Sequence, residues 1–222
     1  MWRARCNGVV VVGGHPLVRE ALKDLIRKES DLVVCGEAAN RAEAIRVLEH
    51  TEARLVITDL GLLDSHGLDL IKDIRARWPQ LGVLVFSMQS EALYAERVLR
   101  AGAHGYVTEN EAPRKLLEAV RHILAGGVYL GESLAMEIAC KSVGRRPSQR
   151  QKAPVDFLSD RELEVFGCVG QGYSTREIGL RLNIHPKTVE TYRARIKEKL
   201  GLLNAHQLLQ HAIRWNKYTI AE

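Results

Sequence analysis

The sequence predicts an α/β domain, a doubly wound five-stranded parallel sheet, followed by an all-α domain of four helices. Three observations carry this prediction. Short β-branched runs alternate with amphipathic stretches over residues 8–126, a polar segment with Gly and Pro follows, and two helix-capping sequences lie beyond it. At 222 residues the chain is long enough for two small domains, each with its own core.

Five short runs rich in Val, Ile and Leu are the candidate strands, at residues 9–12, 32–35, 55–58, 83–86 and 105–107. Five stretches with apolar residues at helical spacing alternate with them, at residues 16–28, 41–49, 68–78, 92–100 and 113–124. Strands that alternate with helices favour a parallel sheet covered on both faces. Ligands of such sheets bind outside the carboxyl ends of the strands, here near residues 13–15, 59–66, 87–90 and 108–110.

The composition changes after residue 126, where consecutive glycines end the last helix of the first domain. Residues 131–140 form one more short amphipathic segment, and the basic stretch 141–154 has the Gly and Pro content of a flexible linker. We therefore divide the chain into a first domain, a short helix with a linker, and a second domain, at residues 8–126, 127–154 and 155–222.

Two capping boxes mark helix starts in the second domain. Ser159 is followed three residues later by Glu162, and Ser174 likewise by Glu177. Hydroxyl and carboxylate then satisfy the free amides of a first helical turn. Pro186 suits the first turn of a third helix. A short helix, a turn and a longer helix at this spacing indicate a helix-turn-helix.

The third helix carries Val189, Ile196 and Leu200 on one face, and its other positions are mainly cationic or hydroxyl-bearing. Such a helix can enter the major groove, with its N-terminal half against base edges and Lys and Arg on phosphates. A solvated surface helix is the alternative, which two capped helices at this spacing disfavour. The net charge of +5 is compatible with nucleic acid, and the few aromatic residues disfavour a stacking platform for single strands. Duplex DNA is the expected partner.

Residues 158–201 resemble the LuxR-type helix-turn-helix in the phrases Leu-Ser-x-Arg-Glu, Gly-x-Ser-x-x-Glu-Ile, Leu-x-Ile and Lys-Thr-Val. The resemblance implies that the recognition helix begins at Lys187, Thr188 and Val189. It implies base-facing side chains at Glu190, Thr191 and Ala194, and side chains near the DNA backbone at Thr175, Arg176, Tyr192, Arg193 and Lys197. It also implies that a final helix, at about residues 204–215, pairs two chains into a dimer on two half-sites. We expect Arg195 and Lys199 to join Arg193 and Lys197 in displacing counterions.

Residues 8–126 resemble a response-regulator receiver domain, which has a flavodoxin-like fold. The matching phrases include Gly-His-Pro-Leu-Val-Arg-Glu after the first strand, Thr-Asp-Leu after the third, and Ala-Gly-Ala-His-Gly-Tyr before and into the fifth. Joined to a LuxR-type output domain, the whole chain is similar to the NarL/FixJ class of response regulators. The resemblance places the phosphoryl-accepting aspartate at Asp59, the switch hydroxyl at Ser87 and the switch aromatic at Tyr106.

The predicted pocket departs from that family at two places. The family has an acidic pair that holds Mg²⁺ where this chain has Gly13 and Gly14, and a phosphoryl-pairing lysine where this chain has Glu109. Mg²⁺ needs a near-octahedral shell of oxygens, for which Asp59 and a carbonyl near Gly61 remain. Phosphoryl transfer depends on cations that offset charge on the equatorial oxygens. We therefore expect weak or no Mg²⁺ binding, no other cofactor and no enzymatic activity, and we expect Asp at positions 13 and 14 with Lys at 109 to restore phosphorylation.

The expected function is sequence-specific, phosphorylation-independent regulation of transcription by a homodimer, which could pair through the receiver-like domain, the final helix or both. The receiver-like domain would then also serve an unidentified protein or ligand partner. One alternative is a phosphorylation switch that uses Asp59 with unusual metal ligation, and another is an adaptor whose helix-turn-helix contacts protein. If Asp59 accepts no phosphate, it caps the following loop. The lone imidazoles of His15, His66 and His104 are expected to be structural.

The remaining composition indicates an intracellular chain. Four cysteines are too widely spaced for a zinc knuckle or a disulfide framework, and free thiols are expected at Cys6, Cys35, Cys140 and Cys168. No stretch has the length and apolar character of a membrane span or of a signal sequence. A cytoplasmic protein without a membrane partner is the expectation.

Overall fold

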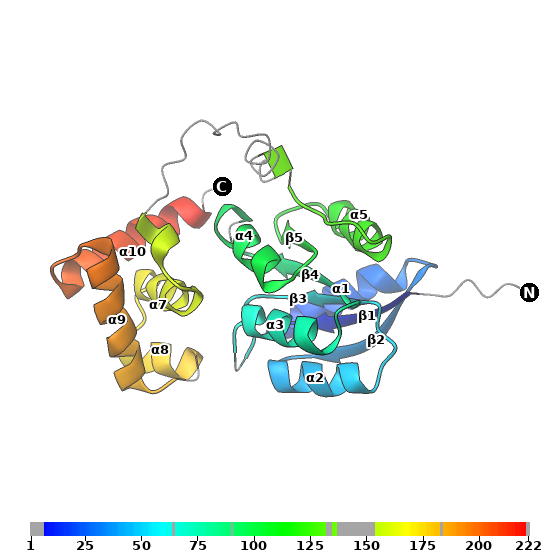
Figure 1. Cartoon of the computed structure of the whole chain (residues 1–222), viewed down its shortest axis with the longest axis horizontal. Helices are drawn as coiled ribbons and strands as arrows, with labels where there is room; N and C mark the ends of the chain where they lie inside the picture. Colours follow the sequence, from blue (N-terminus) through cyan, green and yellow to red (C-terminus); the bar gives the residue numbers. More distant parts are fainter. Residues whose placement is uncertain are drawn as a thin grey trace, which may run out of the picture. The chain divides into compact units, whose positions relative to one another are not determined.

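The structure is a computed structural model. It describes residues 7–63, 65–89, 91–131, 135–136, 154–182 and 184–220. The chain divides into two compact units, Met1–Met136 and Glu137–Glu222, each with its own internal contacts (Figure 1).

The first unit contains the predicted parallel sheet, which confirms the fold class. Its strands are β1 (Asn7–Val12), β2 (Leu32–Ala38), β3 (Leu55–Thr58), β4 (Gly82–Ser87) and β5 (Gly105–Thr108). They pair in the order β2-β1-β3-β4-β5, and every pairing is parallel. The order reverses at β1, so the carboxyl ends of β1 and β3 lie at a topological switch point, where doubly wound sheets bind ligands.

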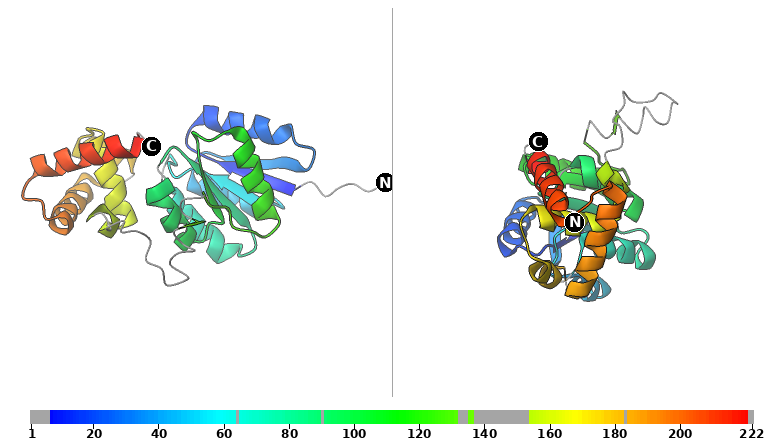
Figure 2. Two further views of the ribbon diagram at one scale, coloured as in Figure 1. Left: turned by 90° about the horizontal axis from the view of Figure 1, so that it is seen from above. Right: turned by 90° about the vertical axis from the view of Figure 1, so that its left-hand side faces the viewer.

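Five helices cover the two faces of the sheet (Figure 2). They are α1 (Pro16–Arg27), α2 (Arg41–Glu49), α3 (Gly67–Arg77), α4 (Glu91–Ala101) and α5 (Pro113–Leu124). Apolar side chains of α1 and α5 pack with those of the central strands in one core, while α2, α3 and α4 lie on the other face. The central strands are buried on both sides, which is why they appear in the sequence as continuous apolar runs.

Strand β2 is three residues longer than predicted, because its pairing with β1 continues past an irregularity between Val9 and Val10. It lies at the sheet edge and its middle residues are half exposed, so its last residues lack an apolar pattern. A short pairing after α5 was also not predicted. The Tyr129 N–H donates to the His104 carbonyl at 2.8 Å, and Tyr129 forms an isolated parallel bridge with Gly105. Residues 141–153 of the linker predicted at 141–154, and most of the segment 131–140, lie outside the described residues.

The second unit confirms the predicted all-α output domain. A 3-10 turn, η1 (Pro154–Phe157), precedes the helices α7 (Asp160–Gly170), α8 (Thr175–Arg181), α9 (Pro186–Leu200) and α10 (Ala205–Ile220). Their core contains Phe166, Ile178, Val189, Ile196 and Leu208, all with no exposed surface. Helix α10 is longer than predicted and packs closely on α7, where a Cβ at Gly170 would lie 2.3 Å from the Ala212 carbonyl oxygen.

Candidate DNA-binding helix and receiver pocket

The pocket predicted at the carboxyl ends of the strands is centred on Asp59, the first residue after β3. Its Oδ1 accepts a hydrogen bond from the Leu60 N–H at 2.6 Å, and its carboxylate also accepts from the Gly61 N–H and the Ser87 hydroxyl. The side chain therefore caps the loop that follows β3. Burial raises the pKa of Asp59, while these hydrogen bonds and the charge of His15 act in the opposite direction.

A second carboxylate, Glu109, follows β5 and interacts electrostatically with Asp59. Burial raises the pKa of Glu109, and the negative charge of Asp59 raises it further, whereas His15 lowers it. One group thus acts on both carboxylates, the exposed imidazole of His15 at the N-cap of α1. Within the described ranges of the chain, no group of three His, Cys, Asp or Glu side chains could hold a metal ion.

The two glycines after β1 differ in the room around them. A Cβ at Gly13 would make ordinary contacts, 3.7 Å from Arg19 Cγ and 3.8 Å from Asp59 Cβ. A Cβ at Gly14 would lie 2.8 Å from the Gly61 carbonyl oxygen, closer than real Cβ atoms approach. That carbonyl, which the sequence suggested as a metal ligand, accepts a hydrogen bond from the Gly14 N–H at 3.3 Å. The loops after β1 and β3 are thus packed together at Gly14.

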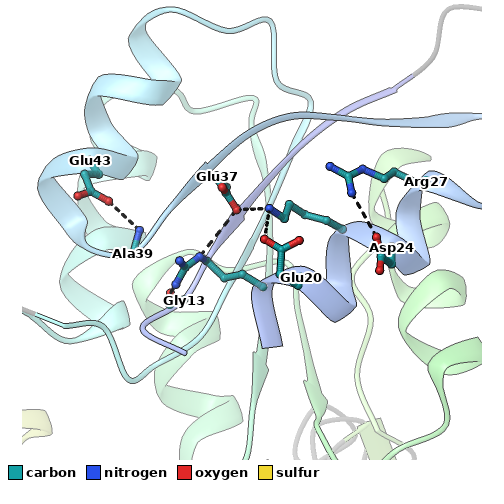
Figure 3. Close-up of polar contacts among 9 residues, drawn as sticks. Gly13, Glu20, Asp24, Arg27, Glu37, Ala39 and Glu43 are labelled. Atoms are coloured by element: carbon teal, nitrogen blue, oxygen red, sulfur yellow. Dashed lines mark hydrogen bonds and ion pairs between the residues drawn. The ribbon is translucent and has the colours of Figure 1, made fainter. Parts of the chain in front are cut away.

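The cations on α1 nearest to these loops are already paired (Figure 3). Arg19 donates to the Gly13 carbonyl at 2.6 Å, and its Nε lies 3.9 Å from Glu37. Lys23 is buried and contacts Glu37 at 2.5 Å and Glu20 at 2.7 Å. The hydrogen bonds that Lys23 donates to Glu20 and then to Glu37 raise the pKa of Lys23. This network ties α1 to β2 beside the pocket.

The two residues at the switch positions of the receiver family are both buried. Ser87 is 2% exposed and Tyr106 is 1% exposed. The Tyr106 hydroxyl donates to the Gln89 carbonyl at 2.8 Å, and the Ser87 hydroxyl donates to Asp59. Burial raises the pKa of Tyr106, so the phenol stays neutral. The hydroxyls at both switch positions are therefore already paired.

The other candidate residues of this unit hold structural contacts, as predicted for two of the three histidines. His66 Nδ1 accepts from the Leu68 N–H at the start of α3, and His104 Nδ1 accepts from the Val83 N–H. His15 differs, because it lies beside the pocket carboxylates without capping α1 through its side chain.

Cys35 and Cys168 are free thiols, and Cys6 and Cys140 lie outside the described residues.

The helix-turn-helix forms as the capping sequences predicted. Ser159 with Glu162 and Ser174 with Glu177 make complete capping boxes at the starts of α7 and α8. Pro186 occupies the first turn of α9, and Gly201 ends that helix in the left-handed conformation with φ 65°. These signals are local, so they could be read from the sequence.

Helix α9 presents most of the predicted DNA-binding residues to the outside. Its exposed side chains include Lys187, Thr188, Glu190, Thr191, Ala194 and Arg195. Tyr192, Arg193 and Lys197 are half buried, as is Thr175 at the start of α8, while Arg176 is exposed. Val189 and Ile196 are fully buried and Leu200 is half buried, which confirms the predicted apolar stripe. The Thr191 hydroxyl donates to the Lys187 carbonyl at 3.0 Å within the helix.

A polar link between α8 and α9 was not predicted. The Thr175 hydroxyl donates to Glu190 Oε1 at 2.5 Å, and Arg193 donates to the Thr175 Oγ1 at 2.8 Å. Arg193 also lies 3.7 Å from Glu190 Oε1. Residues 15 and 18 positions apart in sequence are thus joined across the turn of the helix-turn-helix. No local sequence signal shows such a contact.

Lys199 has a different role from the one predicted. Its Nζ lies 2.6 Å from Glu162 Oε2, and the Glu162 side chain is only 4% exposed. Burial works to raise the pKa of Glu162, but the hydrogen bonds from Lys199 and Ser159 outweigh it and lower that pKa. Lys199 therefore fastens the end of α9 to the start of α7, instead of standing free for a DNA phosphate.

Comparison with known proteins agrees with both folds. Residues 9–121 match the response regulator receiver domain, and residues 156–212 match the bacterial regulatory proteins of the luxR family. The chain belongs to the NarL/FixJ-type response regulators. This response regulator is accordingly a DNA-binding protein of the LuxR family.

Its relatives share both domains. It is 34% identical over 215 residues to the transcriptional activator protein ExaE of Pseudomonas putida, covering 96% of this chain and 99% of that protein. It is 29% identical to the response regulator GacA of Pseudomonas aeruginosa, covering 93% and 95%. The solved structure of the RcsB response regulator of Salmonella typhimurium matches with a TM-score of 0.70 and 25% identity, covering 95% of this response regulator and 98% of RcsB. Among the described helices, none is both long and apolar enough to span a bilayer.

Proposed function

We propose that this response regulator binds duplex DNA as a homodimer, regulates transcription there, and does so without phosphorylation of Asp59. Independence from phosphorylation rests on the composition of the pocket. Gly13, Gly14 and Glu109 stand where the family has two carboxylates and a lysine. The relatives support DNA binding as a dimer and regulation of transcription, since ExaE is a transcriptional activator and RcsB has been solved as dimers bound to DNA.

The charges of the pocket argue against an incoming phosphoryl group. A unit charge about 4 Å away is worth roughly 4 kcal/mol at an effective dielectric constant near 20, so exchanging lysine for glutamate reverses a term of that size. Glu109 interacts with Asp59 strongly enough for the charge of Asp59 to raise its pKa. Arg19 and Lys23 carry the nearby positive charge but are paired with Glu37 and Glu20.

The paired hydroxyls of Ser87 and Tyr106 support a receiver that is competent without phosphate. In a phosphorylation switch, the Ser87 hydroxyl and the Tyr106 ring would each have to move when Asp59 is phosphorylated. Here Ser87 already bonds Asp59, and Tyr106 is already buried with its hydroxyl paired. These contacts favour a receiver in which no phosphoryl group is needed to hold Ser87 and Tyr106 in place.

A phosphorylation switch with unusual metal ligation is the second candidate. It is favoured by the retention of Asp59, Ser87 and Tyr106, and by the solved RcsB structure, which is bound to the promoter rprA in the presence of a phosphomimetic. Under that candidate Mg²⁺ would be held by Asp59 and water with few protein ligands. We propose instead that Mg²⁺ binds weakly or not at all, because Gly13 and Gly14 offer no side-chain oxygens.

The two candidates are separated by labelling and by binding. The wild type is incubated with acetyl phosphate and Mg²⁺, and its intact mass is measured beside that of Asp59→Asn. We expect no mass gain in either protein, and equal affinity of both for a target duplex. A stoichiometric gain that Asp59→Asn abolishes, together with tighter DNA binding, would establish the phosphorylation switch instead.

A further inference from the structure

The carboxylate of Glu190 is exposed and yet held in one place. Its side chain is 59% exposed on the outer face of α9, where most glutamates would move freely. The hydrogen bond from Thr175 and the ion pair with Arg193 both end on Oε1. In the described part of the chain, these contacts leave Oε2 with its lone pairs for a donor from outside.

We propose that Glu190 selects cytosine at one position of each DNA half-site, and that Thr175 and Arg193 are positioning residues for its carboxylate. This inference rests on the proposed DNA binding and adds the base that the recognition helix reads. It assigns to the α8–α9 link a part in sequence preference, beyond holding two helices together.

The chemistry of the major groove explains the choice of base. Cytosine presents only the N4 amino donor there, guanine presents two acceptors, and thymine presents an acceptor and a methyl group. Adenine places its N6 donor beside the N7 acceptor. An ionised carboxylate can only accept hydrogen bonds, so it is repelled by every acceptor edge and matches cytosine best.

The positioning pair makes such a contact specific. A free glutamate loses rotamer freedom when it binds, and a carboxylate fixed in advance loses less. Arg193 also places a positive charge 3.7 Å from Glu190, which lowers the cost of bringing a negative side chain up to DNA phosphates. An exposed pair at i,i+3 alone would contribute little. Thr175, which comes from another helix and bonds both partners, distinguishes this arrangement from an ordinary surface pair.

The test selects binding sites from a pool of duplexes with randomised half-sites, using the full chain. We expect wild type to enrich cytosine at one position of each half-site, by about tenfold over guanine, a ratio within the usual range for one base contact. Glu190→Gln should lose that preference or move it to adenine, because glutamine can bond N6 and N7 together. Glu198→Gln is the matched control, since Glu198 is exposed on the same helix and its loss removes the same charge.

The positioning role has its own pair of variants. Thr175→Val removes the hydroxyl with little change in size and should reduce the preference for cytosine over guanine several-fold. Thr175→Ser keeps a hydroxyl and should restore the preference. An unchanged preference in Thr175→Val would overturn the positioning role, because a purely structural link would leave base selection untouched.

The outcomes also distinguish failure of the proposed role of Glu190 from failure of the proposed sequence-specific DNA binding. Absence of any selected sequence with the wild type would refute sequence-specific DNA binding itself. Selection of a sequence that Glu190→Gln binds with the same preference at every position would leave that function standing and overturn the role of Glu190. A change in base preference that Glu198→Gln reproduces would show a general effect of charge, and would also overturn the role of Glu190.

Discussion

The main-chain N–H of Gly14 donates to the carbonyl of Gly61 at 3.3 Å, and the two loops approach so closely that a side chain at position 14 would collide with that carbonyl. Gly13, its neighbour, has room for a side chain next to Asp59. The expectation that carboxylates at both positions would rebuild a metal site therefore needs revision. Position 13 can accept one without rearrangement, and position 14 cannot.

The double variant Gly13→Asp with Glu109→Lys should gain phosphorylation of Asp59. The new carboxylate would add a metal ligand, and the lysine would pair with a phosphoryl oxygen that Glu109 now repels. Intact-mass spectrometry after incubation with acetyl phosphate and Mg²⁺ measures the gain, and the same variant with Asp59→Asn is the control. Failure of the double variant to accept phosphate, in a folded protein, would show that the pocket lacks more than these charges.

Adding Gly14→Asp should lower stability instead of improving the site. The collision with the Gly61 carbonyl forces the main chain to move, and overpacking of this kind costs typically about 1–3 kcal/mol. Thermal unfolding of Gly13→Asp and Gly14→Asp as single variants tests the difference, because both add the same charge. Equal stability of the two would mean that the loop after β3 yields more easily than its packing indicates.

Glu109→Gln should stabilise the receiver at neutral pH. Burial and the charge of Asp59 raise the pKa of Glu109, so the folded state holds its proton more tightly than the unfolded chain does. A group with a raised pKa stabilises the fold while it is protonated, and that contribution is lost as pH rises through its folded-state pKa. The variant should gain up to about 1 kcal/mol at pH 7, and the gain should vanish near pH 4, where carboxyl groups ordinarily take up protons.

Urea unfolding at several pH values measures this dependence. Glu52→Gln is a suitable control, because Glu52 is an exposed carboxylate of the same unit. A gain for Glu109→Gln that persisted unchanged at acid pH would mean that better packing of the amide, and not removal of a charge, stabilises the variant.

Lys199→Met should destabilise the C-terminal unit by leaving the buried carboxylate of Glu162 without its cation. Removing one partner of a buried pair costs about 3–5 kcal/mol. Lys199 is 41% exposed, and water can partly replace it. We therefore expect roughly 1–3 kcal/mol once solvent screening is allowed for. Calorimetry of the full chain measures the loss, with the receiver transition as an internal reference. Arg195→Met is the control on the same helix, and an equal loss in both would refute a special role for Lys199.

Salt dependence of DNA binding should distinguish the cations of α9. Arg195→Gln should reduce the slope of log affinity against log salt by about 1, and should weaken all sequences alike, as expected for a phosphate contact. Lys199→Gln should change the slope much less, because its ammonium is paired with Glu162. Equal slopes for wild type and Arg195→Gln would remove Arg195 from the DNA-binding face.

The sequence by itself determined the succession of strands and helices along the chain, the capping boxes at Ser159 and Ser174, and the apolar stripe of Val189 and Ile196. These features come from local propensities and from the period of burial, which a linear sequence carries. It also named Asp59, Ser87, Tyr106 and the departures at Gly13, Gly14 and Glu109 through the resemblance to receivers.

Only the tertiary structure decided what those residues contact. It showed that Gly14 packs against Gly61, that Lys199 pairs with Glu162, and that Thr175 holds Glu190 from another helix. Each of these contacts joins side chains or loops that are distant in sequence, and none changes the local pattern of its own segment. Such contacts depend on how whole helices and strands pack against one another. Local propensity and the periodicity of apolar residues therefore do not predict them.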